Sequence, residues 1–423
     1  MSFWHMQLHP SNQKAFPPKK VKEILEKTSC IGVGDWDKGE RIIDDFEKTL
    51  KKGDIVAVKS GKTPIALVEI ISDCERTDNV NNDLDWFKYR RKIKVLDFYK
   101  PEYKFNIPDS RGTLKICRNS NAETTKIIKK WYEKIKSKIY MKELLELLKA
   151  NKNLILTGAP GTGKTYLAKE IAKEMIGAKT DEDLLNSDQF GFVQFHPSYD
   201  YTDFVEGLRP TKPDENCNIG FELKDGIFKK FCQKAKDKTD KNFVFIIDEI
   251  NRGEISKIFG ELFFSIDPDY RGEKGSVKTQ YSNLHEEINE MFYVPENVFI
   301  IGTMNDIDRS VESFDFAMRR RFVWREITAK ESQQMFGNES WKEEAIKRMN
   351  NLNDKIEKIE GLNSSYHIGA AYFKNNLTKY NNDNDKWNKL WDLHLKPLLS
   401  EYLRGMSDQQ EKLQSLVESY NLK

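Results

Sequence analysis

A glycine-rich loop between an apolar strand and an amphipathic run constrains this sequence more than any other feature. The stretch LILTGAPGTGKTYLAKEIA, residues 154–172, fits the spacing G-x-x-x-x-G-K-[ST]. Glycines let successive backbone N–H groups point at an anion, and the following helix adds its positive dipole end. We expect Lys164 to reach the β- and γ-phosphates of a nucleoside triphosphate, and the Thr165 hydroxyl to bind Mg²⁺. The predicted nucleotide-binding residues are Gly158, Ala159, Pro160, Gly161, Thr162, Gly163, Lys164, Thr165 and Tyr166.

A second apolar run, NFVFIID, ends in two adjacent acids, Asp248 and Glu249. Open α/β sheets place their ligands at the carboxyl ends of strands. We expect Asp248 to hold Mg²⁺ and Glu249 to polarise an attacking water. Two acids at a strand end can also simply cap the next helix, but the phosphate loop upstream favours the catalytic interpretation.

A third apolar run, NVFIIGTMN, ends in polar residues and is followed by a cationic run. A side chain such as Asn305 can lie between the acidic strand and the phosphate loop and orient water. Arg320 and Arg321, which follow Arg319, can line a surface. In a ring of subunits they can instead reach the neighbour's nucleotide and neutralise charge on the transferring phosphoryl group.

The order of predicted elements divides the chain. Residues 1–110 are rich in short strand patterns and predict a small β-rich α+β domain, and residues 111–140 predict a linker and connecting helix. Residues 141–327 alternate apolar strands with helices, which predicts an α/β nucleotide-binding domain with a parallel sheet. Residues 328–423 are helical, with an interruption expected near Pro397.

Composition sets few further limits. Lys and Arg number 69 against 67 Asp and Glu, so a net charge of +2 demands neither nucleic acid nor membrane, and any polyanion contact must come from a local patch. The five cysteines are scattered, as in reduced cytosolic proteins. No apolar run approaches the roughly 20 residues of a membrane span. With no secretory pattern at the N-terminus, we expect a cytoplasmic protein without a membrane partner.

Several ordered motifs together resemble the McrB family. They are GAPGTGKT, FHPSYDYTDFVEGLRP, IIDEINRGEISKIFGEL, IIGTMNDIDRS, FDFAMRRRF, HIGAAYF and LKPLLSEYLRG, which cover about residues 150–405. The family comprises AAA+ ring proteins that hydrolyse nucleotide in modification-dependent restriction systems. The resemblance implies a hexameric ring, an AAA+ P-loop domain with a C-terminal helical lid, and GTP rather than ATP as cofactor with Mg²⁺. It also implies a McrC-like endonuclease subunit as partner.

The resemblance assigns further roles residue by residue. Asn305, Asp308 and Arg309 match the family's M-N-x-x-D-R signature, with Asn305 as the sensor, and Arg320 or Arg321 matches the finger that acts across subunits. Relatives often carry a His after the lid's Ile-Gly, where this chain has Ala370. The contribution of that His is therefore missing or supplied by His367.

The N-terminal region faintly resembles EVE and YTH modules, which are small PUA-like barrels that cage a flipped, modified base in aromatic rings. A base stacks on an aromatic face for about 1–3 kcal/mol. The candidate cage residues are Trp4, Trp36 and Trp86, and each of them can equally be a core or rim residue. Lys88, Arg90 and Arg91 are candidates for phosphate contacts.

These features lead us to expect an AAA+ GTPase that acts on DNA with a modified base. No nuclease pattern stands out, so cutting is assigned to the partner subunit. Two alternatives remain open: a MoxR-like AAA+ ATPase that remodels proteins, and a ring scaffold without turnover. A firm preference for ATP would favour the first. The intact Asp248, Glu249 and Asn305 argue against the scaffold.

Overall fold

The computed structural model separates into two compact units, Met1–Lys142 (unit 1) and Glu143–Lys423 (unit 2). It describes residues 1–9, 16–36, 39–77, 86–108, 112–213, 219–287, 290–307, 316–337 and 339–421. Within these ranges, no helix has both the length and the apolar character to cross a membrane.

Unit 1 is built on a seven-stranded sheet in the order β2-β6-β4-β3-β1-β7, with β5 paired to β6. Strands β1 and β3 run parallel, and the other neighbours are antiparallel. The predicted β-rich region is confirmed, whereas the described strands form a path with two ends, so a closed barrel stays a prediction. The strands are β1 (Phe3–Gln7), β2 (Cys30–Val33), β3 (Ile55–Ser60), β4 (Thr63–Ile70), β5 (Glu75–Arg76), β6 (Tyr89–Phe98) and β7 (Leu114–Ile116).

Helices cover both faces of this sheet. Strand β3 is buried on both sides because its side chains alternate in direction. Val56 and Val58 belong to one cluster, with α1 (Pro18–Thr28), while Ile55 and Ala57 belong to another, with α3 (Glu123–Asn151). The short helix α2 (Glu40–Asp44) continues into a π-helical turn, Asp45–Thr49. Helix α3 thus begins within the predicted linker and continues past residue 140, and one of its faces helps to build the core of unit 1.

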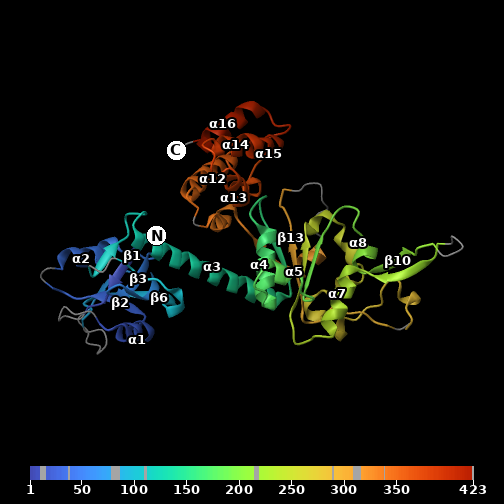
Figure 1. Ribbon diagram of the computed structural model, residues 1–423, viewed down its shortest axis with the longest axis horizontal. Coiled ribbons are helices and arrows are strands. Elements are labelled where there is room, and N and C mark those ends of the chain that lie inside the picture. The colour runs from blue at the N-terminus through green and yellow to red at the C-terminus, as the bar shows by residue number, and fades with distance from the viewer. Residues whose placement is uncertain are drawn as a thin grey trace. The chain divides into compact units, whose positions relative to one another are not determined.

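Unit 2 contains the predicted parallel sheet, of which Figure 1 labels β13. Its strand order is β14-β8-β13-β12-β9. Strand β13 thus lies between the strand that leads into the phosphate loop, β8, and the strand that bears the two acids, β12. All neighbours are parallel, so the carboxyl ends of the strands share one edge. The strands are β8 (Asn153–Thr157), β9 (Phe190–Gln194), β12 (Phe243–Asp248), β13 (Val298–Thr303) and β14 (Val323–Glu326).

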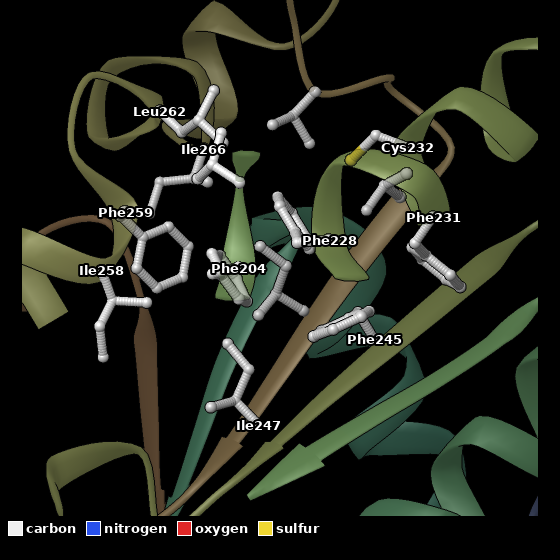
Figure 2. Close-up of a cluster of buried hydrophobic side chains, with 14 of the residues drawn as sticks. Phe204, Phe228, Phe231, Cys232, Phe245, Ile247, Ile258, Phe259, Leu262 and Ile266 are labelled. Atoms are coloured by element: carbon white, nitrogen blue, oxygen red, sulfur yellow. The ribbon is translucent and has the colours of Figure 1, made fainter. Parts of the chain in front are cut away.

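An aromatic cluster packs against this sheet (Figure 2). Phe204 and Phe228 stack with ring centroids 4.7 Å apart, and Phe245 of β12 meets Phe228 edge to face. The flanking helices are α4 (Lys164–Ile176), α5 (Asp181–Leu185), α6 (Tyr201–Phe204), α7 (Ile227–Lys236), α8 (Ile255–Phe259), α9 (Leu262–Ser265) and α10 (Phe316–Arg319). Between α6 and α7 the chain forms an antiparallel hairpin, β10 (Glu206–Pro210) and β11 (Phe221–Asp225), which the sequence pattern did not predict.

The C-terminal helices have a core of their own, as the predicted lid requires. The interruption expected near Pro397 is a π-helical turn, Trp391–Leu395, directly before the helix that contains this proline. The helices are α11 (Ala329–Ser332), α12 (Lys342–Ile356), α13 (Ala370–Lys379), α14 (Lys386–Leu390), α15 (Lys396–Tyr402) and α16 (Gln409–Asn421).

Candidate functional site

The phosphate loop joins β8 to α4 and depends on glycine at three positions. Gly158, Gly161 and Gly163 have φ of +140°, +76° and +85°, which disfavour any residue with a Cβ. A Cβ on Gly158 would lie 2.3 Å from the carbonyl oxygen of Ile327, and one on Gly161 would lie 2.4 Å from the Tyr372 ring. The loop can therefore keep this conformation only with glycine at these places.

Lys164 begins α4 and its side chain turns back over the loop. It is only 7% exposed, and its Nζ donates to the carbonyl oxygens of Gly158 and Ala159, each at 2.9 Å. The hydroxyl of Thr162 also bonds the Ala159 carbonyl. The ammonium group is thus held at the centre of the loop, where an anion bound by the backbone would meet it.

A chain of hydrogen bonds joins the ends of three elements. The Thr165 hydroxyl, on α4, donates to Asp248 Oδ1 at 2.7 Å, and the Thr303 hydroxyl, at the end of β13, donates to the same oxygen at 2.6 Å. The N–H of Glu249 donates to Thr303 Oγ1 at 3.3 Å, and Asn305 Nδ2 donates to Glu249 Oε1 at 2.7 Å. The structure thus brings Thr165, Asp248, Glu249 and Asn305 together in one group.

Glu249 has an unusual backbone. Its φ and ψ are 50° and 45°, in the left-handed region that non-glycine residues rarely adopt. Such conformations cost on the order of 1–3 kcal/mol and concentrate at functional sites. The strand ends at Asp248, and this turn directs the Glu249 carboxylate toward Asn305.

The residues present fit a nucleotide with Mg²⁺. The loop is a cradle that a Cβ would fill, and its ammonium group matches phosphate charge. A hydroxyl and a carboxylate within 2.7 Å of each other form the oxygen donor pair that Mg²⁺ prefers. Lys164 would hold the phosphates of the nucleotide, and Thr165 and Asp248 would hold Mg²⁺.

Two neighbours of this group were not predicted. Asp306 accepts a hydrogen bond from the Gly158 backbone and faces Lys164, while burial raises its carboxyl pKa above the usual value. Arg252 Nε lies 3.4 Å from Glu249 Oε2. Asp306 follows the predicted Asn305, and Arg252 lies three residues after the predicted Glu249. The motif spacing alone did not distinguish either of them from an ordinary loop residue.

The lid contacts the phosphate loop through its backbone. The N–H groups of Gly369 and Ala371 donate to the carbonyl oxygens of Pro160 and Gly161, each at 2.9 Å. A Cβ on Gly369 would lie 2.1 Å from the carbonyl carbon of Gly161, so only glycine allows this approach. The side chain of His367 instead lies beside Glu357, with Nε2 3.1 Å from Oε1. The lid thus meets the loop without a histidine at the position of Ala370.

The arginines separate into exposed and buried residues. Arg319 and Arg320 are exposed, and Arg319 lies over the Trp324 ring. Arg321 is 8% exposed, with its guanidinium over Phe263 and its Nε 3.5 Å from Asp267 Oδ2. Because its side chain is packed within its own subunit, the structure favours Arg320 over Arg321 as a residue that reaches a neighbour. Asp308 and Arg309 lie outside the described residues.

In unit 1 the structure corrects the prediction for Trp4. Its side chain is 0% exposed in the core, and its Nε1 donates to Asp54 Oδ2 at 3.1 Å. Trp4 is therefore a core residue and cannot stack on a base. Arg91 is also wrong as a phosphate contact, because its buried guanidinium donates to the carbonyl oxygens of Phe46, Glu47 and Ser72.

The other two tryptophans both approach Gly34, Trp36 with its ring and Trp86 with its backbone. A Cβ on Gly34 would be 3.8 Å from the Trp36 ring and 3.0 Å from the Trp86 carbonyl oxygen. Trp86 is 40% exposed, and the half-buried Trp36 ring covers Gly39. Lys88 and Arg90 lie at the start of β6, shortly after Trp86, and both are half-buried. We call Trp36 and Trp86 the candidate aromatic site of unit 1.

Comparison with known proteins agrees with this geometry. Residues 153–322 match the family model "AAA domain (dynein-related subfamily)", and residues 344–414 match "McrB, alpha-helical lid domain". The "Type IV methyl-directed restriction enzyme EcoKMcrB subunit" of Escherichia coli (strain K12) is 40% identical over 279 residues, which are 64% of this chain and 58% of that protein. The "Type II restriction enzyme BsuMI component YdiS" of Bacillus subtilis (strain 168) is 29% identical over 198 residues, 40% of this chain and 55% of that one. The matches thus span little more than half the length of these relatives.

Proposed function

Because the chain is a McrB-family AAA+ protein, we propose that it is the GTP-hydrolysing subunit of a modification-dependent restriction system. The observation that carries this proposal is the hydrogen-bonded group of Thr165, Asp248, Thr303, Glu249 and Asn305 beside the phosphate loop. Acids, hydroxyls and an amide meet there at the carboxyl edge of a parallel sheet, where such sheets bind ligands.

Each residue has a task in this proposal. Lys164 and the loop N–H groups bind the phosphates, while Thr165 and Asp248 hold Mg²⁺, which neutralises phosphate charge when it is bound. Glu249 accepts a proton from the attacking water. Asn305 donates to Glu249 Oε1 and so fixes the direction of that carboxylate. Asn305 therefore acts as a positioning residue.

Replacing Glu249 by Gln tests the hydrolytic role. General-base catalysis contributes about 10²–10⁴-fold, so we expect kcat for GTP to fall by that factor while GTP binding persists. Glu254→Gln is the matched control, since Glu254 lies in the same segment and pairs with the exposed Lys257. Turnover of Glu249→Gln at the control rate would refute the role. Measuring ATP beside GTP tests nucleotide choice, and a firm ATP preference would favour a MoxR-like remodelling ATPase.

We further propose that the subunits form a hexameric ring in which Arg320 completes the neighbour's site. Mixing Glu249→Gln with Arg320→Ala tests this arrangement. Each variant alone should be nearly inactive, but a mixed ring contains interfaces with one intact Glu249 and one intact Arg320. Recovery of turnover on mixing supports action across subunits, whereas no recovery contradicts it.

The partner and the DNA complete the proposal. We assign cutting to a McrC-like endonuclease subunit, and recognition of a modified base to Trp36 and Trp86 of unit 1. The name of the Escherichia coli relative, a methyl-directed restriction enzyme subunit, supports a role with modified DNA. Binding of the full chain to matched duplexes with and without methylated cytosine or adenine tests it. Equal affinity for all of them would remove the recognition role.

A further inference from the structure

We propose that the lysine face of α3 in unit 1 binds the phosphate backbone of duplex DNA, independently of base modification. The lysine face comprises Lys130, Lys134 and Lys138, together with the ring of Tyr103. The inference rests on the proposed function, which brings DNA to unit 1, but it names a contact surface distinct from the aromatic site.

Charge is concentrated on this part of the helix. Residues 123–142 contain seven lysines and two glutamates, a net charge of 7 − 2 = +5, while the whole chain carries +2. The two acids are Glu123 and Glu133. This segment is therefore a local basic patch on a nearly neutral protein, and such a patch is the electrostatic signature of nucleic-acid binding.

The lysines are exposed because the opposite face of α3 is used for packing. Ile128, Trp131 and Ile135 are buried against the sheet of unit 1, and Trp131 Nε1 also donates to Asp97 Oδ2. Helical spacing then leaves Lys130, Lys134 and Lys138 on the exposed side. Ile139 of α3 is 39% exposed, but the covered Ile128, Trp131 and Ile135 leave no continuous apolar stripe to insert into a lipid bilayer, which favours DNA over a membrane surface.

Within the described part of the chain, no carboxylate lies within ion-pair distance of these three lysines. Elsewhere the lysines of a basic helix do have acidic partners. In α7, Lys229 pairs with Glu206 and Asp225, and Lys234 pairs with Asp188. Two of the four lysines of α7 are thus paired inside unit 2, whereas the charge of the lysine face is available for an external anion.

An aromatic ring orders two of the three ammonium groups. Lys134 and Lys138 lie over Tyr103, with Nζ 4.8 Å and 5.9 Å from the ring centroid. Such contacts restrict side chains that would otherwise lose more entropy on binding. Three lysines at intervals of four residues are about 6 Å apart along the helix axis. Duplex DNA carries one charge per about 1.7 Å of its axis, so the three can contact separate phosphates.

The test uses the full chain with Lys130, Lys134 and Lys138 all replaced by Ala. We measure binding to labelled duplexes, with and without methylated cytosine, between about 50 and 200 mM salt. Each lost phosphate contact makes the negative slope of log K against log salt shallower by about 0.9, so the magnitude of the slope should fall by about 2.7. Affinity for both duplexes should fall by the same factor, and hydrolysis without DNA should not change.

Two controls separate this effect from general loss of charge or fold. Alanine at the exposed lysines Lys347, Lys358 and Lys379 of the lid removes the same charge and should leave the slope unchanged. Arginine at the three α3 positions keeps the charge and should keep the slope. If the alanine variant binds DNA with the wild-type slope, or loses affinity only for methylated DNA, the inference is wrong.

The outcomes also separate this inference from the proposed function. If the wild type binds methylated and unmethylated DNA equally, but the salt slope of the alanine variant changes as expected, the base-recognition proposal is wrong and the lysine-face inference is supported. If the wild type binds no DNA, both fail. Lysine-dependent binding to vesicles with phosphatidylserine, in place of DNA, would assign the surface to a membrane and overturn the inference.

Discussion

The two regions to which we assign function are built in opposite ways. In unit 2 the chemistry lies in polar side chains at the ends of parallel strands, and each is fixed by a hydrogen bond to the next, from Thr165 to Asn305. In unit 1 the proposed recognition residues are two tryptophans near Gly34, both outside the strands. The first site is determined by sheet topology, and the second by which aromatic residues the core leaves exposed.

This difference decides which positions tolerate change. A residue at a strand end in unit 2 has partners on two other elements, so its replacement disturbs the whole group. The contribution of a tryptophan in unit 1 to the core follows its burial, with the half-buried Trp36 between the two extremes. Trp4 and Trp86, at 0% and 40% exposure, represent these extremes.

The largest effect is expected for Trp4→Ala. Truncation of a buried tryptophan costs about 3–5 kcal/mol, and the change also leaves Asp54 without its indole donor. Chemical denaturation should show this loss in the transition of unit 1. Trp86→Ala should change the free energy of unfolding by no more than about 0.5 kcal/mol, as for other surface positions. Equal destabilisation by both would contradict the distinction between core and exposed tryptophans.

Thr303→Val sharpens the comparison in unit 2. The hydroxyl of Thr303 bonds the Asp248 carboxylate and accepts from the Glu249 N–H, and valine has a similar shape without it. Hydrogen bonds to charged groups contribute about 1.5–3 kcal/mol, so we expect kcat to fall by about 10–150-fold. Thr303→Ser should restore most of the rate. Full activity of the valine variant would show that the hydrogen-bonded group does not order the site.

Alanine at Trp86 should affect DNA rather than stability, whereas alanine at Trp36, whose ring packs against the core of unit 1, should affect both. Stacking contributes about 1–3 kcal/mol per base, so preference for a modified duplex should fall by about 5–150-fold. The measurement is the ratio of affinities for modified and unmodified DNA, which general charge effects cancel. If neither change alters the ratio while Trp4→Phe does, the structural assignment of the aromatic site is wrong.

Much of unit 2 was predictable because its signals are local. The phosphate loop needs glycines at fixed spacing. The strands that lead to the loop, to Asp248 and to Asn305 are recognisable as apolar runs that stop at polar residues. The alternation of strands and helices then implies a parallel sheet, whose shared edge collects Asp248, Glu249 and Asn305. Thr303 was visible at its strand end, yet its double hydrogen bond depends on the register between β12 and β13.

What escaped prediction depends on contacts distant in the sequence. The burial of Trp4 and Arg91 follows from the packing of helices on both faces of the unit 1 sheet, which residue type does not reveal. The hairpin β10–β11 has weak alternation and was missed. The approach of Gly369 to Gly161 joins segments some two hundred residues apart, and only the steric need for glycine marks it.

The smallest effect is expected for His367, the residue that the sequence offered as a substitute for the lid histidine of relatives. Burial lowers its pKa below the usual 6.5, although Glu357, Asp354 and Glu326 act in the opposite direction. The folded lid therefore favours neutral His367, whereas the unfolded chain binds the proton with an ordinary pKa. Stability rises with pH wherever the unfolded state binds more protons, so the contribution of His367 is present above about pH 6.5 and is lost below it.

His367→Gln should accordingly flatten the acid side of the profile of unfolding free energy against pH, without changing stability above neutral pH. His196→Gln, at an exposed position of unit 2, is the matched control. If His367 instead served nucleotide at the lid, as the resemblance allowed, the variant would lower kcat or weaken GTP binding at neutral pH. An unchanged neutral rate with a flattened acid profile would show that the contact of the lid with the phosphate loop, made by Gly369 and Ala371, does not require His367.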